Sequence, residues 1–433
     1  MNNILKILLI FYFLTGCSFQ KQSNPLSKEE AIKEKQQNIN EILKKKEVLS
    51  KEFNPNLKIK LYSKVINSSY LQNLDNNNTR ANYNGSLQSV LKYKFKKIEN
   101  FSQYEPEISF NQKNIIFFDN KGYILNFDYN SNLIWKKNYY SKSEIKQKPI
   151  LFFTQSKNTL IIADNVAKLY ALDINTGKLL WEKKNTAPFN SQIKFYRDKF
   201  YLIDFENTLR AYSLNDGKEI WNNKTQNSLI RSQQKLSLVI VKEKIYFNNS
   251  LGDISAVDIN TGDLLWQIPT QSNYTYNAGF FLKMSDIVAE NETLFFSNNQ
   301  NEFFSIDMKT GNLNWKQEIN SNLRPIIINN FIFTVSLEGY LIVIEKDSGN
   351  IIRVNDIFGN FKNKKRIKIK PSGFIIGIKN IYLSTDKGHL LIIDINNGKV
   401  KSTLKIDNKK ISRPVVVNQN LYVVTDNSII KFD

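Results

Sequence analysis

The chain has 433 residues, with 60 basic against 40 acidic side chains and a formal net charge of +20. Hydrophobic residues make up 41% of it and aromatic residues 12%, which excludes a compositionally disordered chain. The positive charge would suit a nucleic acid or an anionic membrane surface. However, the basic residues are spread along the whole sequence, so we interpret them as a solvated surface and expect no nucleic-acid partner.

The N-terminus has the pattern of a lipoprotein signal peptide over residues 1–16. A single lysine, Lys6, precedes an apolar run at residues 7–14. A membrane-spanning helix needs about 20 apolar residues, so this run fits the core of a signal peptide instead. The sequence Leu-Thr-Gly-Cys that ends at Cys17 has the form of a lipobox. We therefore predict that Cys17 is lipidated and carries fatty acyl chains such as palmitate.

Cys17 is the only cysteine of the chain, which bounds its chemistry. Once lipidated, it leaves no thiol for disulfides, metal sites or nucleophilic catalysis. More than one acyl chain gives stable membrane anchoring. Ser18 follows, where an aspartate would favour retention in the inner membrane. We therefore expect a protein anchored to the outer membrane and facing the periplasm.

Residues 17–57 are predicted to form a polar tether and a short helix. The helix is expected from Ser27, because Ser27 and Glu30 have the spacing of a capping box. Its apolar stripe is thin, and Asn54-Pro55 marks its latest end. Residues 58–90 are partly asparagine-rich, and we predict an irregular lead-in there.

The rest of the chain is a degenerate repeat of the form Asp-x-x-x-Gly-x-x-x-Trp. Its clearest copies run from Asp173 to Trp181 and from Asp258 to Trp266. Strand-like runs flank each copy. A period in the forties with strand-like content is the signature of a β-propeller. The copies begin at residues 128, 173, 213, 258, 307, 345, 394 and 433, which are 45, 40, 45, 49, 38, 49 and 39 residues apart.

Each repeated position has a structural role. The aspartate ends a strand and can accept hydrogen bonds from turn amides, while the glycine supplies the positive φ that the hairpin needs. The tryptophan lies in the next strand, where its ring can wedge between neighbouring blades. All five tryptophans of the chain occupy this position. The repeat residues are Trp135, Trp181, Trp221, Trp266, Trp315, Gly177, Gly217, Gly262 and Gly311.

The number of strands and the chain ends predict how the propeller closes. A second turn signal and an opening strand precede each repeat unit, which gives four strands per blade. The last copy, residues 413–433, supplies only three strands, and the strictly alternating residues 91–97 can pair as the fourth. We predict an all-β, eight-bladed propeller over residues 91–433. Seven blades are the alternative if the copy at Asp128 is not a full blade.

The repeat resembles that of the quinoprotein-type, PQQ-like propellers. Together with the lipobox and the single-propeller length, it makes the chain similar to the BamB family over roughly residues 45–433. These are lipoproteins of the machinery that assembles β-barrel proteins in the outer membrane. The resemblance implies a non-catalytic scaffold without a cofactor, monomeric within a complex. Its expected partners are a POTRA domain of the central assembly protein, BamA, and unfolded outer-membrane proteins.

The resemblance also implies partner-binding residues. In that family, a Ser-Leu-x-Leu-Arg loop after the third blade contacts the POTRA domain, and Ser-Leu-Ile-Arg at 228–231 stands at the matching place. Leu229, Ile230 and Arg231 are therefore implied contacts, and leucine beside arginine suits an interface hot spot. A second family stretch, Leu-Ser-Asp-x-Asp, is matched at Asp286 but departs at Val288. An ordinary loop is the alternative interpretation of the segment that contains Leu229 and Arg231.

Two other functional classes compete with the scaffold. A quinone-dependent dehydrogenase shares the repeat, but a family member would carry paired cysteines, which this chain lacks. His389 is the only histidine, and its place beside a blade turn predicts a surface strand position. The sequence contains no metal-ligand cluster, catalytic triad or phosphate loop. A polyanion- or envelope-surface-binding propeller is the second alternative, with residues 362–370 (Lys-Asn-Lys-Lys-Arg-Ile-Lys-Ile-Lys) as its best feature.

Overall fold

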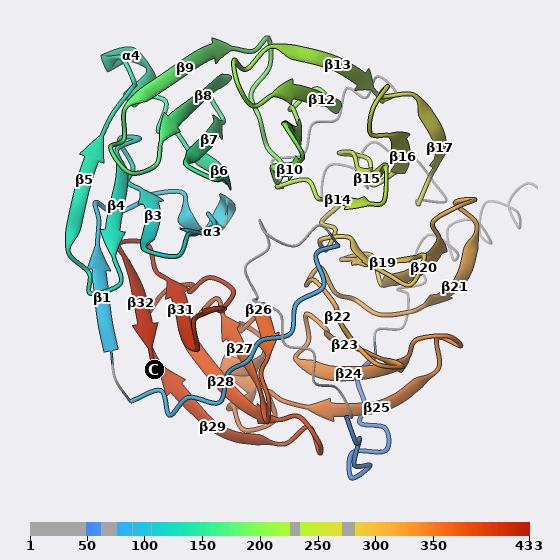
Figure 1. The fold of residues 1–433 in the computed structure, drawn as a ribbon. Coiled ribbons are helices and arrows are strands. Elements are labelled where there is room, and N and C mark those ends of the chain that lie inside the picture. Colours follow the sequence, from blue (N-terminus) through green and yellow to red (C-terminus); the bar gives the residue numbers. More distant parts are fainter. Residues whose placement is uncertain (1–48, 62–75, 89, 105, 226–233, 271–281) are drawn as a thin grey trace, which may run out of the picture. The chain divides into compact units, whose positions relative to one another are not determined.

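Strands dominate the structure, and they form eight four-stranded antiparallel sheets. The sheets are arranged as blades around a common centre, with the first strand of each blade innermost and the fourth outermost (Figure 1). This confirms the predicted eight-bladed, all-β propeller. The copy at Asp128 belongs to a full blade, which excludes the seven-bladed alternative.

The computed structural model describes residues 49–61, 76–88, 90–104, 106–225, 234–270 and 282–433. All of these belong to Val48–Asp433, the larger of the two units into which the chain divides. The predicted signal peptide, Cys17 and the predicted helix from Ser27 lie outside the described residues. Within the described ranges, no helix is long and apolar enough to cross a membrane.

The first four blades are built from consecutive strands. Blade 1 contains β2 (Ser109–Phe110), β3 (Asn114–Phe118), β4 (Ile124–Asp128) and β5 (Leu133–Lys137). Blade 2 contains β6 (Leu151–Ser156), β7 (Thr159–Asp164), β8 (Lys168–Asp173) and β9 (Leu179–Lys184). Blade 3 contains β10 (Lys194–Tyr196), β11 (Lys199–Ile203), β12 (Thr208–Ser213) and β13 (Glu219–Lys224). Blade 4 contains β14 (Leu238–Val241), β15 (Lys244–Asn248), β16 (Ile254–Asp258) and β17 (Leu264–Ile268).

The next three blades follow the same order. Blade 5 contains β18 (Val288–Glu290), β19 (Thr293–Asn298), β20 (Glu302–Asp307) and β21 (Leu313–Gln317). Blade 6 contains β22 (Ile326–Ile328), β23 (Phe331–Val335), β24 (Tyr340–Glu345) and β25 (Ile351–Asp356). Blade 7 contains β26 (Pro371–Ile376), β27 (Asn380–Thr385), β28 (His389–Asp394) and β29 (Val400–Lys405). Three described helices of four residues each lie in connections: α3 (Phe101–Tyr104), α4 (Lys142–Ile145) and α6 (Asn363–Arg366).

Blade 8 joins the two ends of the propeller. Its order is β1 (Val90–Lys94), β32 (Ser428–Phe432), β31 (Asn420–Val424) and β30 (Val415–Val417). The register pairs Leu91 with Lys431 and Lys94 with Ser428. The predicted closing strand is thus present, although it ends at Lys94 rather than at residue 97. Beyond it, the amide of Phe95 still donates to the carbonyl of Asn427 at 3.1 Å.

Position within the blade decides which strands are apolar. Middle strands have neighbouring blades on both faces, so they are continuous apolar runs, as in β3, whose five residues are all buried. Outer strands face solvent along one edge, and β13 accordingly alternates half-buried and exposed residues. The turns between strands carry the repeat aspartate: the Oδ1 atom of Asp173 accepts the amides of Asn175 and Thr176 at 3.2 and 2.8 Å. Gly177 then adopts a φ of +69°.

The tryptophans join each of five blades to the next one. A Cβ on Gly262 of blade 4 would lie 2.5 Å from the Trp221 ring of blade 3, so only glycine fits under the ring. Each indole Nε1 also donates to a backbone carbonyl of the next blade. These bonds are Trp135 to Ile174 (3.2 Å), Trp181 to Leu214 (3.0 Å), Trp221 to Ile259 (3.3 Å), Trp266 to Met308 (3.1 Å) and Trp315 to Lys346 (2.9 Å).

Other side chains replace tryptophan at two junctions. Arg353 of blade 6 is fully buried and donates to the carbonyls of Asn396 and, at 3.3 Å, Ile395 in blade 7. Tyr93 of β1 is also fully buried, and its hydroxyl donates to the carbonyl of Tyr129 in blade 1 at 2.9 Å. The ring of blades is therefore bonded across junctions where the sequence repeat has decayed.

Two segments that precede β1 pack on the propeller. Residues 49–57, which the sequence analysis assigned to the tether, lie along the outer strand of blade 6. There Phe53 and Val354 exchange two backbone hydrogen bonds of 3.1 and 2.8 Å. Residues 76–88 contain no helix or strand, as predicted for an irregular segment, yet many of them are buried. They run from the centre of the propeller outward across blades 7 and 8 to β1 (Figure 1).

Candidate functional site

The two predicted contact segments belong to the connections that follow β13 and β17. Leu229, Ile230 and Arg231 lie outside the described residues. The structure describes the C-terminal ends of both connections, residues 234–237 before β14 and residues 282–287 before β18. These two ends, together with the buried ion pair behind them, form the candidate site.

Gln234 holds the two connections together. Its Oε1 atom accepts the amide of Met284 at 3.0 Å, and its Nε2 atom donates to the carbonyl of the same residue. Ser237 adds a third bond, because its hydroxyl accepts the amide of Ile287 at 3.0 Å. The residues that follow the first predicted contact loop are therefore fixed beside the second predicted contact stretch itself.

Buried side chains hold residues 282–287, the segment before β18, against the blades. Leu282 and Met284 are buried in the core cluster between blades 4 and 5. Ser285 pairs with Ser297 of β19 through two bonds, an amide-to-carbonyl bond of 2.8 Å and an amide-to-hydroxyl bond of 2.9 Å. A segment that is already held in one conformation needs little further ordering on binding, which lowers the entropic cost of association.

Asp286 faces an internal cation. Its Oδ2 atom lies 3.7 Å from a guanidinium nitrogen of Arg324, and only 19% of its side chain is exposed. Arg324 is fully buried, and this burial lowers its pKa to about 10, although Asp286 and Glu107 act in the opposite direction. The guanidinium stays charged at neutral pH, so Asp286 is first of all its counter-ion. The small exposed part of Asp286 is what a partner could reach.

An axial segment, residues 76–80, lies among the first strands of several blades. The side-chain amide of Asn77 is fully buried and donates to the carbonyl of Ile287 at 3.0 Å and to Gln192 at 3.1 Å. Asn76 accepts the amide of Ala289 at 2.9 Å. The axial segment thus braces the same residues, 287–289, that continue the second contact segment.

The sequence analysis missed Gln234, Arg324 and the axial segment. Their partners lie tens to hundreds of residues away, as in the 210-residue separation of Asn77 and Ile287. An asparagine-rich stretch is typical of exposed irregular chain, so its composition gave no sign of burial. The structural role of the stretch is clearest at Asn77, whose side-chain amide has four buried acceptors around it.

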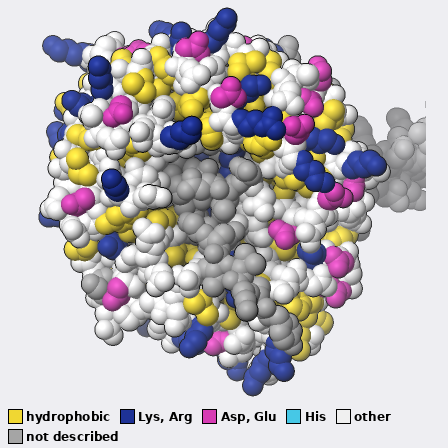
Figure 2. All heavy atoms as spheres, viewed as in Figure 1, with side chains coloured by type: hydrophobic (Ala, Val, Ile, Leu, Met, Phe, Trp, Pro, Cys, Tyr) yellow, Lys and Arg dark blue, Asp and Glu magenta, His cyan; other side chains and the backbone are white. Residues whose placement is uncertain are grey.

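The surface charge is dispersed on the face shown in Figure 2. Lysine and arginine side chains lie around its rim, with aspartate and glutamate side chains among them. Ion pairs such as Lys242–Glu292 at 2.8 Å, on neighbouring blades 4 and 5, neutralise part of the positive charge. This distribution suits the solvated surface expected from the sequence.

Residues 362–370 form a basic projection between blades 6 and 7. Helix α6 contributes Lys364, Lys365 and Arg366, and the exposed side chain of Ile367 follows it. Arg366 is engaged within the protein, because it donates to Asp356 at 2.6 Å. Ile369 is buried and anchors the end of the segment.

Among the described residues, the Nδ1 atom of the His389 ring has no hydrogen-bond partner. It begins β28, is half-buried and lies with its ring 5.3 Å from that of Phe361. Burial lowers its pKa below the ordinary value, and Lys405 and Lys365 lower it further. In the part of the chain that the structure describes, no three histidine, cysteine, aspartate or glutamate side chains are grouped as metal ligands.

Comparison with protein families gives one match. A family model described as outer membrane protein assembly factor BamB matches residues 120–355, more than half of the chain. No functionally curated protein matches the chain in sequence. The matched range covers blades 2 to 5 entirely, and with them both ends of the candidate site.

Solved structures share the fold. BamB from Moraxella catarrhalis is similar with a TM-score of 0.63 and 15% identity, covering 79% of this chain and 100% of that one. A europium-containing methanol dehydrogenase has a TM-score of 0.59 and 13% identity, covering 82% and 89%. Quinohemoprotein alcohol dehydrogenase from Comamonas testosteroni has a TM-score of 0.59 and 10% identity, covering 82% and 78%. At these identities the structural likeness shows the fold and does not separate scaffold from enzyme.

Proposed function

Because the chain belongs to the family of the outer membrane protein assembly factor BamB, we propose that it is a non-catalytic scaffold of the machinery that assembles outer-membrane β-barrel proteins. The family match over residues 120–355 is the observation that carries this proposal. Lipidated Cys17 anchors the protein to the periplasmic face of the outer membrane, and the residues after it act as a tether.

In this proposal, the candidate site binds a POTRA domain of the central assembly protein. Leu229 and Ile230 supply apolar contacts, and Arg231 supplies a planar cation for a carboxylate of the partner. The Gln234–Met284 bonds support the proposal, because they hold the ends of both contact segments together. A rigid base under short binding loops favours a preformed surface over one that orders on binding.

Deletion of the gene in its host tests the proposed function. We expect lower amounts of outer-membrane β-barrel proteins and higher membrane permeability, without complete loss of assembly. Re-expression of the wild-type chain should restore both properties. The Cys17→Ser variant should restore them poorly, because it lacks the lipid anchor. Unchanged barrel-protein amounts and permeability in the deletion strain would contradict the proposal.

A second candidate function, binding to an anionic envelope surface, rests on the basic projection. Ile367 is 76% exposed and stands among lysines, which suits insertion beside negatively charged lipid headgroups. Co-sedimentation with vesicles that contain about 30% anionic lipid distinguishes this candidate function from the scaffold function. Binding that persists at high salt and is lost in Ile367→Asp would favour the surface-binding function. Binding that is absent or vanishes with salt would leave the projection as an ordinary solvated surface.

A further inference from the structure

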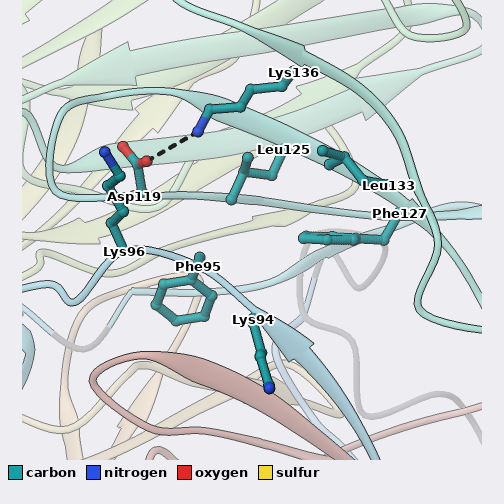
Figure 3. A pocket seen from close by; sticks show the side chains of 8 residues that line it. All are labelled: Lys94, Phe95, Lys96, Asp119, Leu125, Phe127, Leu133 and Lys136. Carbon is teal, nitrogen blue, oxygen red and sulfur yellow. Dashed lines mark ion pairs between the residues drawn. The ribbon is translucent and has the colours of Figure 1, made fainter.

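The junction between blades 8 and 1 contains a cavity that the proposed function does not use. Its volume is about 330 Å³, at the lower end of the range for ligand sites. The wall of blade 1 is apolar, with Leu125, Phe127 and Leu133, and Asp119 lies at one end (Figure 3). The closing strand and the residues after it form the other wall, with Lys94, Phe95 and Lys96.

Asp119 is the unusual member of this lining. Its side chain is fully buried, and its Oδ1 atom accepts the turn amides of Lys121 and Tyr123. Its Oδ2 atom accepts no hydrogen bond from the residues that the structure describes. The Nζ atom of Lys136 forms an ion pair with Oδ2 at 3.5 Å, as the dashed line in Figure 3 shows, and 34% of the Lys136 side chain is exposed. A buried carboxylate oxygen that accepts no hydrogen bond carries a desolvation cost that a ligand hydroxyl would relieve.

The neighbouring junction shows which group fits such a site. Asp164 of blade 2 holds the position of Asp119, and its Oδ1 atom accepts turn amides in the same way. Its Oδ2 atom accepts the phenolic hydroxyl of Tyr140 at 2.5 Å. The Tyr140 ring is buried between the two blades and packs edge-on against Tyr170.

The closing strand brings no tyrosine to the corresponding place. Tyr93 of blade 8 and Lys137 of blade 1 hold equivalent positions. Tyr93 pairs with Ile429 and Lys137 pairs with Ile124, and each isoleucine stands four residues before the repeat aspartate of its blade. Tyr140 lies three residues after Lys137, and Lys96 lies three residues after Tyr93. Lys96 therefore stands where the other junction has Tyr140. On the facing strand, Leu125 likewise replaces the larger Tyr170. Both rings that fill the junction between blades 1 and 2 are therefore replaced here, and the cavity is left.

We propose that this cavity binds a tyrosine side chain of a partner polypeptide, with the phenol donating to Asp119 Oδ2. The apolar wall contacts the ring, as core side chains do around Tyr140. Lys94, Lys96 and Lys136 surround the cavity, so the tyrosine is expected in an acidic stretch of the partner. This site is separate from the loops after β13 and β17, and its occupation does not depend on the POTRA contact.

The test measures binding of two peptides to the full-length protein by ligand-observed NMR titration. The probes are N-acetyl-Glu-Tyr-Glu-amide and its phenylalanine counterpart. We expect the tyrosine peptide to bind about tenfold more tightly, because only it donates to the buried carboxylate. Asp119→Asn should remove this difference while keeping the turn bonds through its Oδ1 atom. No binding of the tyrosine peptide, or equal binding of the two, would overturn the proposal.

A second variant fills the cavity from within. Lys96→Tyr places a phenol where Tyr140 stands in the other junction, so it should abolish binding of the tyrosine peptide and leave the fold intact by circular dichroism. Lys92→Tyr is the matched control, because it removes the same charge four residues earlier, at an exposed residue of β1 outside the cavity. Equal loss in both variants, or unchanged binding in Lys96→Tyr, would assign the peptide to another site and overturn the proposal.

Discussion

Individual glycines decide how closely neighbouring blades can pack. Gly262 adopts a φ of +78°, and the Trp221 ring of the preceding blade covers it. The same geometry recurs where Trp181 lies on Gly217 and Trp315 on Gly349. The repeat therefore places glycine and tryptophan together because one accommodates the other across a blade junction, in addition to the turn that the glycine forms.

Gly262→Ala should destabilise the protein by about 2–4 kcal/mol. The left-handed backbone costs roughly 1 kcal/mol for a residue with a side chain, and the added methyl overpacks the junction by a further 1–3 kcal/mol. Urea unfolding measures the change in midpoint. Gly359→Ala is the control, because Gly359 lies outside the left-handed region and the atoms nearest to its added Cβ, those of Asp356, would be 3.3 Å or more away. Equal midpoints for the two variants would contradict this prediction.

Asp164 should make the free energy of unfolding fall as pH rises, the opposite of the usual effect of a carboxylate. Burial raises its pKa from 3.8 to about 6, so the folded state binds the proton more tightly than the unfolded state. The stability it contributes is fully present below pH 4 and is lost as pH rises through 6. The loss amounts to about 3 kcal/mol, from about 1.4 kcal/mol per pKa unit. Asp164→Asn should therefore be more stable relative to wild type at pH 7 than at pH 4.

Unfolding midpoints at pH 4 and pH 7 check this prediction. Asp173→Asn is the control with the opposite sign, because the Thr176 hydroxyl lowers the pKa of the exposed Asp173 carboxylate. The stability that Asp173 contributes is present above the pKa of this carboxyl in the unfolded state, and it is lost as pH falls below that value. A pH profile of Asp164→Asn parallel to that of the wild type would show that Asp164 is not the source of the dependence.

At the scale of elements, the sequence was most informative where the pattern is local. The aspartate-glycine turn and the alternating residues 91–97 lie within a few residues of the structure they specify, and the blades and the closing strand follow from them. The end of β1 at Lys94 could not be predicted, because alternation continues after pairing stops. The segments at 49–57 and 76–80 carry no local pattern, since blades distant in sequence hold them in place. For the same reason, the Gln234–Met284 bonds of the candidate site could not be foreseen.

The segment at 49–57 pairs with the outer strand of blade 6 through a single β-bridge between Phe53 and Val354. Phe53→Pro removes the amide that donates to Val354, so the segment should detach. We expect the Val354 amide, which donates to the Phe53 carbonyl at 2.8 Å, to exchange with solvent at least about tenfold faster. Hydrogen exchange measures this rate. Phe53→Ala keeps the backbone pair and removes a half-exposed side chain, so it should leave the exchange rate nearly unchanged. Unaltered exchange in Phe53→Pro would contradict the pairing.

At the scale of the whole propeller, strand pairing between its two ends closes the ring of blades. Blade 8 draws β1 from the beginning of the propeller and three strands from its end, so no blade is left with an unpaired closing position. Half-buried tryptophans, together with buried arginine and tyrosine side chains, bond consecutive blades in the ring. A ring held in this way suits a scaffold, because loops on rigid blades keep their relative positions when a partner binds.

The most direct measurement of the scaffold function is binding of the purified protein to isolated POTRA domains of the central assembly protein. Wild type would be compared with Leu229→Asp and Arg231→Glu, and with Leu265→Asp as a control on the exposed outer strand of blade 4. We predict that the wild type and the control bind, and that each loop variant loses more than about 30-fold in affinity with its fold intact by circular dichroism. Failure of the wild type to bind, or full binding by both loop variants, would contradict the proposed site and its partner.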